Sequence, residues 1–186
     1  PEDAGSHTVC AVMTDEFLLA LTRNGEIMAF NPMDLRTCWH QSLETDGEIT
    51  GPPTYSRGMI FFGGEGGRVL GLNPRAKRLK TLAEGMKQVV AQPAAGDGVL
   101  YVGAQDHHLH ALDPRSGQHI WKSEAFEHSI SSAPFVFDGL VVVCINQVGV
   151  YLLEAETGER VWHFPVGDGA NLFSDLLVDK GVVYVG

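Results

Sequence analysis

The sequence predicts an all-β protein, a β-propeller of four-stranded antiparallel blades, and three observations carry this prediction. One pattern of residues recurs about every 41 positions along the 186-residue chain. Each repeat holds short runs of Val, Ile, Leu, Phe and Tyr bounded by turn residues, which is the composition of strands. The 22 glycines show no collagen-like period, so they indicate many turns. A period near 40 with four strands per unit is typical of propeller blades.

Four segments of the chain superimpose as repeats: LALTRNGEIMAFNPMDLRTCW, FGGEGGRVLGLNPRAKRLKT, VGAQDHHLHALDPRSGQHIW and VCINQVGVYLLEAETGERVW. Ala29, Gly71, Ala111 and Leu152 mark the same position in each repeat and lie 42, 40 and 41 residues apart. An apolar run such as VLYVG precedes each marker, and a fifth run, VVYVG, closes the chain. We therefore expect four blades and the first two strands of a fifth, at about residues 7–45, 46–86, 87–127, 128–168 and 169–186.

Turn residues separate the third and fourth strands of each repeat. Three repeats place Pro at the second turn position, in NPMD, NPRA and DPRS. Gly117 and Gly158 follow in the third and fourth repeats, where glycine is free to adopt a positive φ. The second repeat has Ala76 and Lys77 in place of this Ser/Thr-Gly pair.

These repeats resemble the PQQ-like repeat family, in which a YVG-type strand, an ALD-type strand and a Ser/Thr-Gly turn are followed by Trp. The resemblance covers essentially the whole chain. It implies that Trp39, Trp121 and Trp162 pack against the next blade and tie neighbouring blades together. An indole suits this role because it buries a large apolar surface and still donates its N–H. The second repeat has Thr81 instead of Trp, so we expect its blade to dock more loosely or to contact a partner.

The repeat count does not close a ring. The chain starts with Pro1 in a first-strand segment and stops after the second strand of the fifth unit. Members of the PQQ-like repeat family, which this chain resembles, usually have seven or eight blades. An open blade edge also favours pairing with additional strands of the same polypeptide. We expect the chain to be part of a longer polypeptide whose further blades complete a seven- or eight-bladed propeller.

Charge and hydropathy limit the expected partners. A net charge of -10 leaves no basic surplus to neutralise phosphates, so we expect no nucleic-acid partner. No apolar run approaches the length of a membrane span, so we expect no direct membrane insertion. We expect a protein or peptide partner on the propeller loops, because loops held by a rigid scaffold are where partners bind.

The segment of the chain that most resembles a metal site is DHHLHALDPRSGQHIW, which holds three histidines within four positions. Comparison of the repeats places His107, His108 and His110 in a turn and at the start of the third strand of the third blade. His108 and His110 project to one face of the strand and His107 to the other, so at most two share a metal locally. A cluster alone lacks ligand geometry, and we expect structural histidines without a metal.

Other candidate chemistry has a structural explanation. In EHSISSAP, His128 stands beside serines 129, 131 and 132, but the alternation and the position in the repeat favour a strand over a catalytic serine. Asp15, Glu16 and Asp97 are expected in solvated hairpin turns. The glycines of FGGEGGRVLG precede no helix N-terminus, so they do not predict a phosphate loop.

The three cysteines, Cys10, Cys38 and Cys144, are far apart and show no CxxC spacing. This pattern predicts neither a disulfide framework nor a zinc site, and we expect buried free thiols. Free thiols favour a reducing compartment such as the cytoplasm. The family resemblance implies the periplasm or the cell surface, which we expect on balance.

Three functions are compatible with the repeats. The leading hypothesis is a non-enzymatic, BamB-like scaffold or accessory domain that mediates protein–protein interaction, with no catalytic, cofactor-binding or metal-binding residues and no cofactor. The second is a fragment of a PQQ-dependent quinoprotein alcohol dehydrogenase. That resemblance implies PQQ, calcium ligands and an adjacent Cys pair, and this sequence has no such pair. The third is an extracytoplasmic sensor domain of a signalling protein such as a kinase.

Replacing Trp121 by Ala should lower the free energy of unfolding by about 3 to 5 kcal/mol, as truncation of a buried large aromatic does. Denaturant melts of the variant measure this loss. A loss below about 1 kcal/mol would contradict the docking role of this indole.

Overall fold

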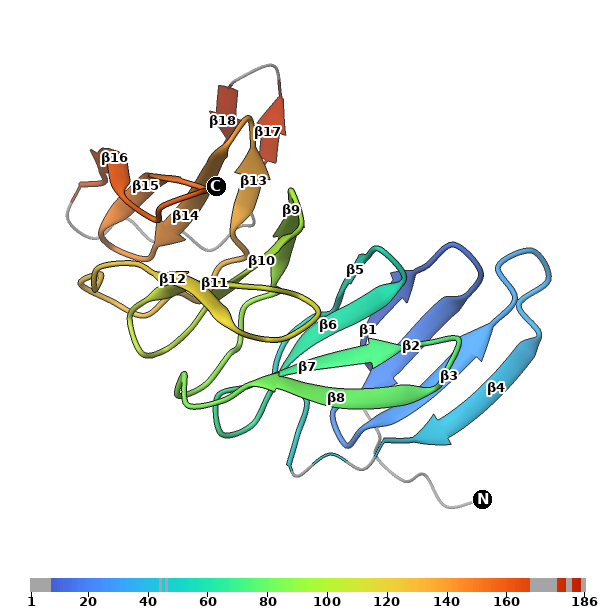
Figure 1. The fold of residues 1–186 in the computed structure, drawn as a ribbon. Helices are drawn as coiled ribbons and strands as arrows, with labels where there is room; N and C mark the ends of the chain where they lie inside the picture. The colour runs from blue at the N-terminus through green and yellow to red at the C-terminus, as the bar shows by residue number, and fades with distance from the viewer. Residues whose placement is uncertain (1–7, 44, 46, 168–176, 180–181, 185–186) are drawn as a thin grey trace.

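Four four-stranded antiparallel sheets follow one another along the chain and confirm the predicted propeller fold (Figure 1). The computed structural model describes residues 8–43, 45, 47–167, 177–179 and 182–184, and all the named elements in this part are strands. Within each sheet the strands pair in the order of the sequence. Short loops between antiparallel neighbours account for this order, because a hairpin leaves the next strand beside the last one.

The strands of the first two sheets are β1 (Thr8–Met13), β2 (Leu18–Thr22), β3 (Glu26–Phe30), β4 (Thr37–Ser42), β5 (Thr54–Ser56), β6 (Met59–Gly64), β7 (Arg68–Asn73) and β8 (Arg78–Ala83). Those of the next two are β9 (Ala94–Gly96), β10 (Val99–Gly103), β11 (Leu109–Leu112), β12 (His119–Lys122), β13 (Phe135–Phe137), β14 (Leu140–Ile145), β15 (Gly149–Glu154) and β16 (Arg160–Pro165). A further antiparallel pair joins β17 (Leu177–Asp179) to β18 (Val182–Tyr184).

The sheets are arranged with their first strands adjacent. Contacts link β1 to β5, β5 to β9 and β9 to β13, so consecutive first strands lie side by side. The fourth strands β4, β8, β12 and β16 are mostly exposed, whereas the middle strands are mostly buried. Each sheet therefore runs from an inner strand to an outer strand, as blades of a propeller do.

The hydrophobic core lies between sheets. One cluster joins the first and second sheets through Leu19, Ile27, Ile60 and Leu72 among others. Equivalent clusters join the second sheet to the third and the third to the fourth. The two faces of an antiparallel sheet cannot be buried within that sheet, so each blade depends on its neighbour for its core.

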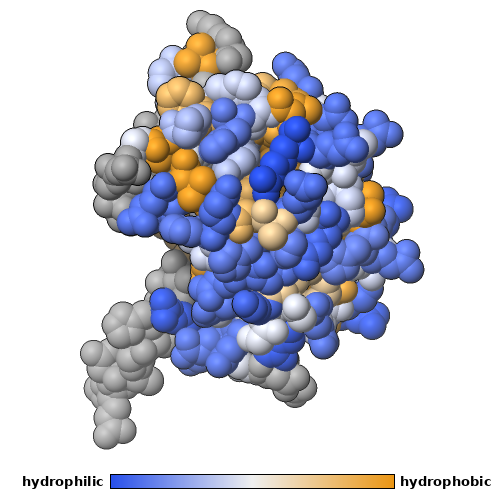
Figure 2. Space-filling view, turned by 90° about the vertical axis from the view of Figure 1, so that its left-hand side faces the viewer, coloured by the Kyte–Doolittle hydropathy of each residue, from blue (hydrophilic) through white to orange (hydrophobic). Residues whose placement is uncertain are grey.

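The outer side of the fourth blade carries exposed apolar residues. Val161, Trp162 and Phe164 on β16 are 49%, 50% and 54% exposed, and we call these three residues the β16 strip. Figure 2 shows hydrophobic residues gathered in the upper part of the face it views, the part of the molecule that holds the fourth sheet. Among the residues that the structure describes, no helix is long and apolar enough to cross a membrane.

Two details of the sequence-based assignment are wrong. Residues 127–134, the EHSISSAP segment, form a connection between β12 and β13 and no strand. The alternation there arises because Ile130 is buried in the core, while the Ser132 hydroxyl donates to the Cys144 carbonyl oxygen at 2.8 Å. In the second sheet, Gly71 pairs with Lys80, so Lys80 rather than Thr81 stands where the other sheets have Trp.

The turn between the third and fourth strands has one residue with positive φ in each of the four sheets. Gly117 and Gly158 adopt φ of 79° and 76°, as their sequence predicts. Leu35 and Lys77 hold the equivalent positions with φ of 56° and 52°. This left-handed conformation raises the energy of an L-residue, because its Cβ approaches the following carbonyl oxygen.

Replacing Leu35 by Gly should raise the free energy of unfolding by about 0.5 to 1 kcal/mol, the cost of a left-handed L-residue less the extra chain entropy of glycine. The Leu35 side chain is 63% exposed, so little packing is lost. Urea denaturation measures the change, and Leu35→Ala is the control because it keeps Cβ. A gain of equal size for Ala would contradict the assignment of strain.

Candidate functional site between the blades

The three predicted histidines lie in the third blade and point in different directions. His107 lies in the turn before β11 with φ of 71°, and its Nδ1 is 3.2 Å from the Phe126 carbonyl oxygen. His108 Nδ1 donates to the Ser123 carbonyl oxygen at 2.8 Å. The His110 ring is 6.2 Å from the ring of His108, centroid to centroid. His107 and His108 thus tie the turn before β11 to the segment after β12.

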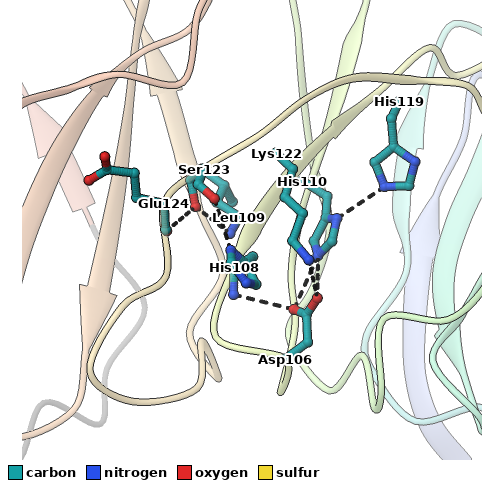
Figure 3. Close-up of polar contacts among 8 residues, drawn as sticks. All are labelled: Asp106, His108, Leu109, His110, His119, Lys122, Ser123 and Glu124. Carbon is teal, nitrogen blue, oxygen red and sulfur yellow. Dashed lines mark hydrogen bonds and ion pairs between the residues drawn. The ribbon is translucent and has the colours of Figure 1, made fainter.

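The buried His110 is the centre of a polar cluster with Asp106 and with the exposed residues His119 and Lys122 (Figure 3). Its Nε2 lies 3.1 Å from both carboxylate oxygens of Asp106, and its Nδ1 lies 3.1 Å from Nε2 of His119. Lys122 Nζ is 3.2 Å from the same carboxylate. Since an ionised carboxylate only accepts, His110 donates its Nε2–H to Asp106 and accepts at Nδ1 from His119.

The electrostatics of the cluster favour a neutral His110. Burial lowers its pKa, the neighbouring Asp106 opposes this shift, and the charges of His119 and Lys122 add to the lowering. For Asp106, burial acts to raise the pKa, but hydrogen bonds and charge from His110 and Lys122 bring the net pKa below its usual value. The cluster is therefore a neutral imidazole beside an ionised, lysine-paired carboxylate.

The arrangement of these groups resembles a structural cross-link more than a metal centre. Both His110 ring nitrogens already have partners on opposite sides of the ring. In the described part of the chain, no three His, Cys, Asp or Glu side chains come together in a way that could hold a metal ion. The absence of a metal stays a prediction.

Trp121 lies across the boundary between the third and fourth blades. Its Nε1–H donates to the Ala155 carbonyl oxygen at 3.0 Å. A Cβ atom on Gly158 would lie 2.5 Å from a ring carbon of Trp121, so only glycine lets the turn approach the indole this closely. The Tyr101 hydroxyl donates to the same carbonyl at 3.1 Å. Two donors from the third blade therefore converge on one turn of the fourth.

The other two tryptophans have different surroundings. Trp39 is half-buried, packs edge-on against Phe17 and has the Lys77 ammonium 5.3 Å from its ring centroid. Its Nε1 is buried and has no hydrogen-bond partner among the residues that the structure describes. Trp162 is 50% exposed and stacks on Phe164 in the β16 strip. The docking roles of Trp39 and Trp162 stay predictions.

In the second blade Lys80 stands in the register position of the missing Trp. Its Nζ donates to the Arg115 carbonyl oxygen in the third blade at 3.1 Å. Gly117 of the third blade packs at this boundary too, because a Cβ there would lie 1.9 Å from the Leu82 carbonyl oxygen. A lysine-to-carbonyl contact therefore bridges the two blades where the other blades have an indole.

Two of the predicted solvated carboxylates also bridge blades. Asp15 accepts from the Tyr55 hydroxyl at 2.6 Å, and Glu16 forms an ion pair with Arg75 at 2.5 Å. The hydrogen bond to Asp15 is the main cause of the raised pKa of Tyr55. Asp97 lies exposed in its turn. The sequence shows these residues only as turn residues, because their partners lie about 40 to 60 positions away.

The cysteines are free in the structure, but the prediction that all are buried is wrong. Cys144 is buried, Cys10 is partly buried and Cys38 is exposed on the outer strand β4. Burial raises the pKa of both Cys10 and Cys144 to about 11. These two thiols are protonated at neutral pH and are poor nucleophiles.

Two cavities open between the second and third blades. One has a volume of about 280 Å³ and is lined by Trp121 and by Asp106, His110, His119 and Lys122 of the polar cluster, together with residues 84–86. The other has a volume of about 580 Å³ and lies among the turns β5–β6, β9–β10 and β11–β12. Sequence reasoning missed the second cavity, since its lining comes from three separate turns.

Acidification should destabilise the protein through His110. An unfolded histidine titrates near pH ~6.5, and the folded pKa is lower, so the unfolded chain takes up the proton first. The stability that depends on neutral His110 is therefore present above about pH 6.5 and is lost as the pH falls below it.

Urea denaturation at about pH 7.5 and pH 5.5 measures this loss. His110→Gln keeps a donor near Asp106 and should show a smaller difference between the two pH values. The exposed His128→Gln is the matched control and should behave as the parent. A full pH effect in His110→Gln would show that another group is responsible.

Comparison with known proteins agrees with the fold. A family model described as outer membrane protein assembly factor BamB matches residues 2–80 and 78–186. The quinohemoprotein alcohol dehydrogenase of Comamonas testosteroni is 32% identical over 179 residues, covering 83% of this chain and 25% of that protein. BamB of Yersinia pestis is 28% identical over 176 residues, covering 86% and 43%.

Solved structures show the same architecture. BamB from Moraxella catarrhalis matches with a TM-score of 0.70 at 17% identity, over 95% of this chain and 56% of that chain. The computationally designed Ika8 protein matches with a TM-score of 0.80 at 16% identity, over 95% and 54%. The chain spans less than half the length of the curated relatives it matches. The matched repeats and the four radial sheets together show that this chain belongs to the BamB-type family of PQQ-like repeat propellers.

Proposed function

We propose that this chain is a section of a non-enzymatic propeller scaffold that binds a protein partner outside the cytoplasm. Further blades of the same parent polypeptide would cover the β16 strip, as the turn at Gly158 covers Trp121 in the third blade. The relatives named as outer membrane protein assembly factors support a role in protein assembly and an extracytoplasmic location.

The observation that carries this proposal is the cavity of about 580 Å³ among the turns β5–β6, β9–β10 and β11–β12. Its volume falls in the range of ligand pockets, and loops on a rigid scaffold are common binding sites. Interblade contacts hold the β11–β12 turn, since Lys80 reaches the backbone of Arg115 and a Cβ on Gly117 would meet the backbone of Leu82.

The second candidate is a quinoprotein dehydrogenase, which the match to the Comamonas testosteroni protein favours. The described residues of this chain do not fit the quinone cofactor and the calcium ion of such an enzyme. The cysteines lie at positions 10, 38 and 144, and the described residues hold no cluster of acidic or other ligands suited to a metal. If the parent protein is a dehydrogenase, its cofactor is held by other parts of its chain.

The parent polypeptide, purified from its source, should carry neither stoichiometric calcium nor quinone absorbance. With a photoreactive amino acid in place of Ser56, which lines the cavity, it should cross-link in cells to one discrete protein. The same amino acid in place of Arg23, in the turn β2–β3, is the control and should give no such product.

Elemental analysis, a visible spectrum and mass spectrometry of the cross-linked band provide the readouts. A quinone band together with one equivalent of calcium would make the parent an oxidoreductase. Equal cross-linking from the cavity position and from the control position would contradict the proposal that the cavity is the binding site.

A further inference from the structure

The cavity of about 580 Å³ combines an apolar floor with a charged mouth. Met59, Phe61 and Val99 form the floor, together with Ala95 and Pro114. The charged side chains in the lining are Arg57, Asp97, Asp113 and Arg115. Pockets with a few placed charges over an apolar surface fix both the orientation and the chemistry of what they bind.

Arg57 occupies a turn position that suits another residue type. It has φ of 49° and precedes Gly58, with φ of 80°, in the two-residue turn between β5 and β6. The equivalent first positions in the next two blades are Asp97 and Asp138, with φ of 50° and 46°. Asp and Asn tolerate this left-handed conformation and are preferred there. Strain retained beside a cavity is typical of binding sites.

The Arg57 guanidinium reaches across the mouth of the cavity. Its Nη1 lies 3.1 Å from the point that a Cβ on Gly98 would occupy, so the side chain lies over the neighbouring blade's turn. Arg115 enters from the turn β11–β12. Among the described residues, neither guanidinium forms a hydrogen bond or an ion pair, so both are available to a ligand.

The two aspartates of the lining differ in availability. The Asp113 carboxylate accepts from the backbone N–H groups of Arg115 and Ser116, at 2.9 and 2.7 Å, and from the Ser116 hydroxyl at 2.9 Å. Asp113 is thereby occupied in its own turn. The hydrogen bonds from Ser116 and Arg115 lower the pKa of Asp113, so this carboxylate stays ionised. Asp97 is exposed and carries the second negative charge of the lining. The lining therefore carries two guanidinium groups and two carboxylates, and one of these carboxylates is anchored in its own turn through Oδ1, in a chain whose net charge is -10.

We propose that this cavity binds an acidic segment of the partner protein, in which an Asp or Glu lies next to an apolar residue. The segment's carboxylate contacts Arg57 and Arg115, because guanidinium groups bind carboxylates through paired, charge-assisted hydrogen bonds. The apolar neighbour packs on Met59, Phe61 and Val99. Asp97 disfavours a phosphate group, whose charge is close to -2. This proposal rests on the proposed function as a partner-binding scaffold.

The test uses the full parent polypeptide and a fluorescein-labelled peptide of alternating Leu and Glu, with binding followed by fluorescence anisotropy. Otherwise identical peptides with Gln, Lys or phosphoserine in place of Glu are the comparison probes. The Glu peptide should bind, its binding should weaken with added salt because the contacts are electrostatic, and the Gln and Lys peptides should not bind. Tighter binding of the phosphoserine peptide would overturn the carboxylate assignment.

Three variants separate recognition from folding. Arg57→Asn should weaken binding of the Glu peptide about tenfold or more, while the melting temperature stays the same or rises because Asn suits the turn. Asp97→Asn removes the repelling charge and should tighten binding about threefold. Asp138→Asn changes the same turn position in the fourth blade, away from the cavity, and should leave binding unchanged.

Unchanged binding in Arg57→Asn, or weaker binding in Asp97→Asn, would overturn the proposal. If the Lys peptide bound in place of the Glu peptide, acid recognition would be wrong. If no peptide bound while the photoreactive residue at Ser56 still cross-linked to a protein in cells, the scaffold function would stand and the acidic specificity would fall. If neither occurred, both proposals would fail.

Discussion

The burial of each sheet against its neighbour is the constraint on which the rest of this structure depends. Leu19 and Ile27 of the first sheet share one core cluster with residues of the second sheet, and the same relation recurs at each later boundary. No blade has a complete core of its own. Every interblade contact is therefore a contact that stabilises the fold, and the outer face of the last sheet keeps exposed apolar residues such as Trp162 and Phe164.

The boundaries solve the same packing problem with different chemistry. Trp121 meets a glycine turn and donates to Ala155, whereas Lys80 reaches the backbone of Arg115 where an indole is missing. Trp39 contacts Lys77, and its N–H has no partner in the described part of the chain. A repeat thus tolerates change at its boundaries as long as the middle strands stay apolar, because burial supplies most of the favourable energy.

Some of the polar side chains in this protein stabilise the fold, and others are available to bind a partner. His110 has both ring nitrogens in use and sits beside a lysine-paired Asp106, so it holds strands and turns of one blade together. Within the described part of the chain, the guanidinium groups of Arg57 and Arg115 have no such partners, and they face a cavity. Whether a polar group is already satisfied within the protein separates these two cases, because a satisfied buried group gains little from a ligand and an unpaired exposed one gains more.

The sequence by itself determined the strand composition, the period and the positions of the turns, because strand propensity and turn chemistry act between residues close in the chain. That information predicted the all-β propeller and the left-handed glycines at 117 and 158. Only the tertiary structure decided which residues meet across blades. It placed Lys80 where the other sheets have Trp, and it made residues 127–134 a connection between strands. It also exposed Cys38 and brought His110 into hydrogen-bond contact with His119. Those outcomes depend on how sheets about 41 residues apart in the sequence stack on one another, and local sequence patterns do not determine that stacking.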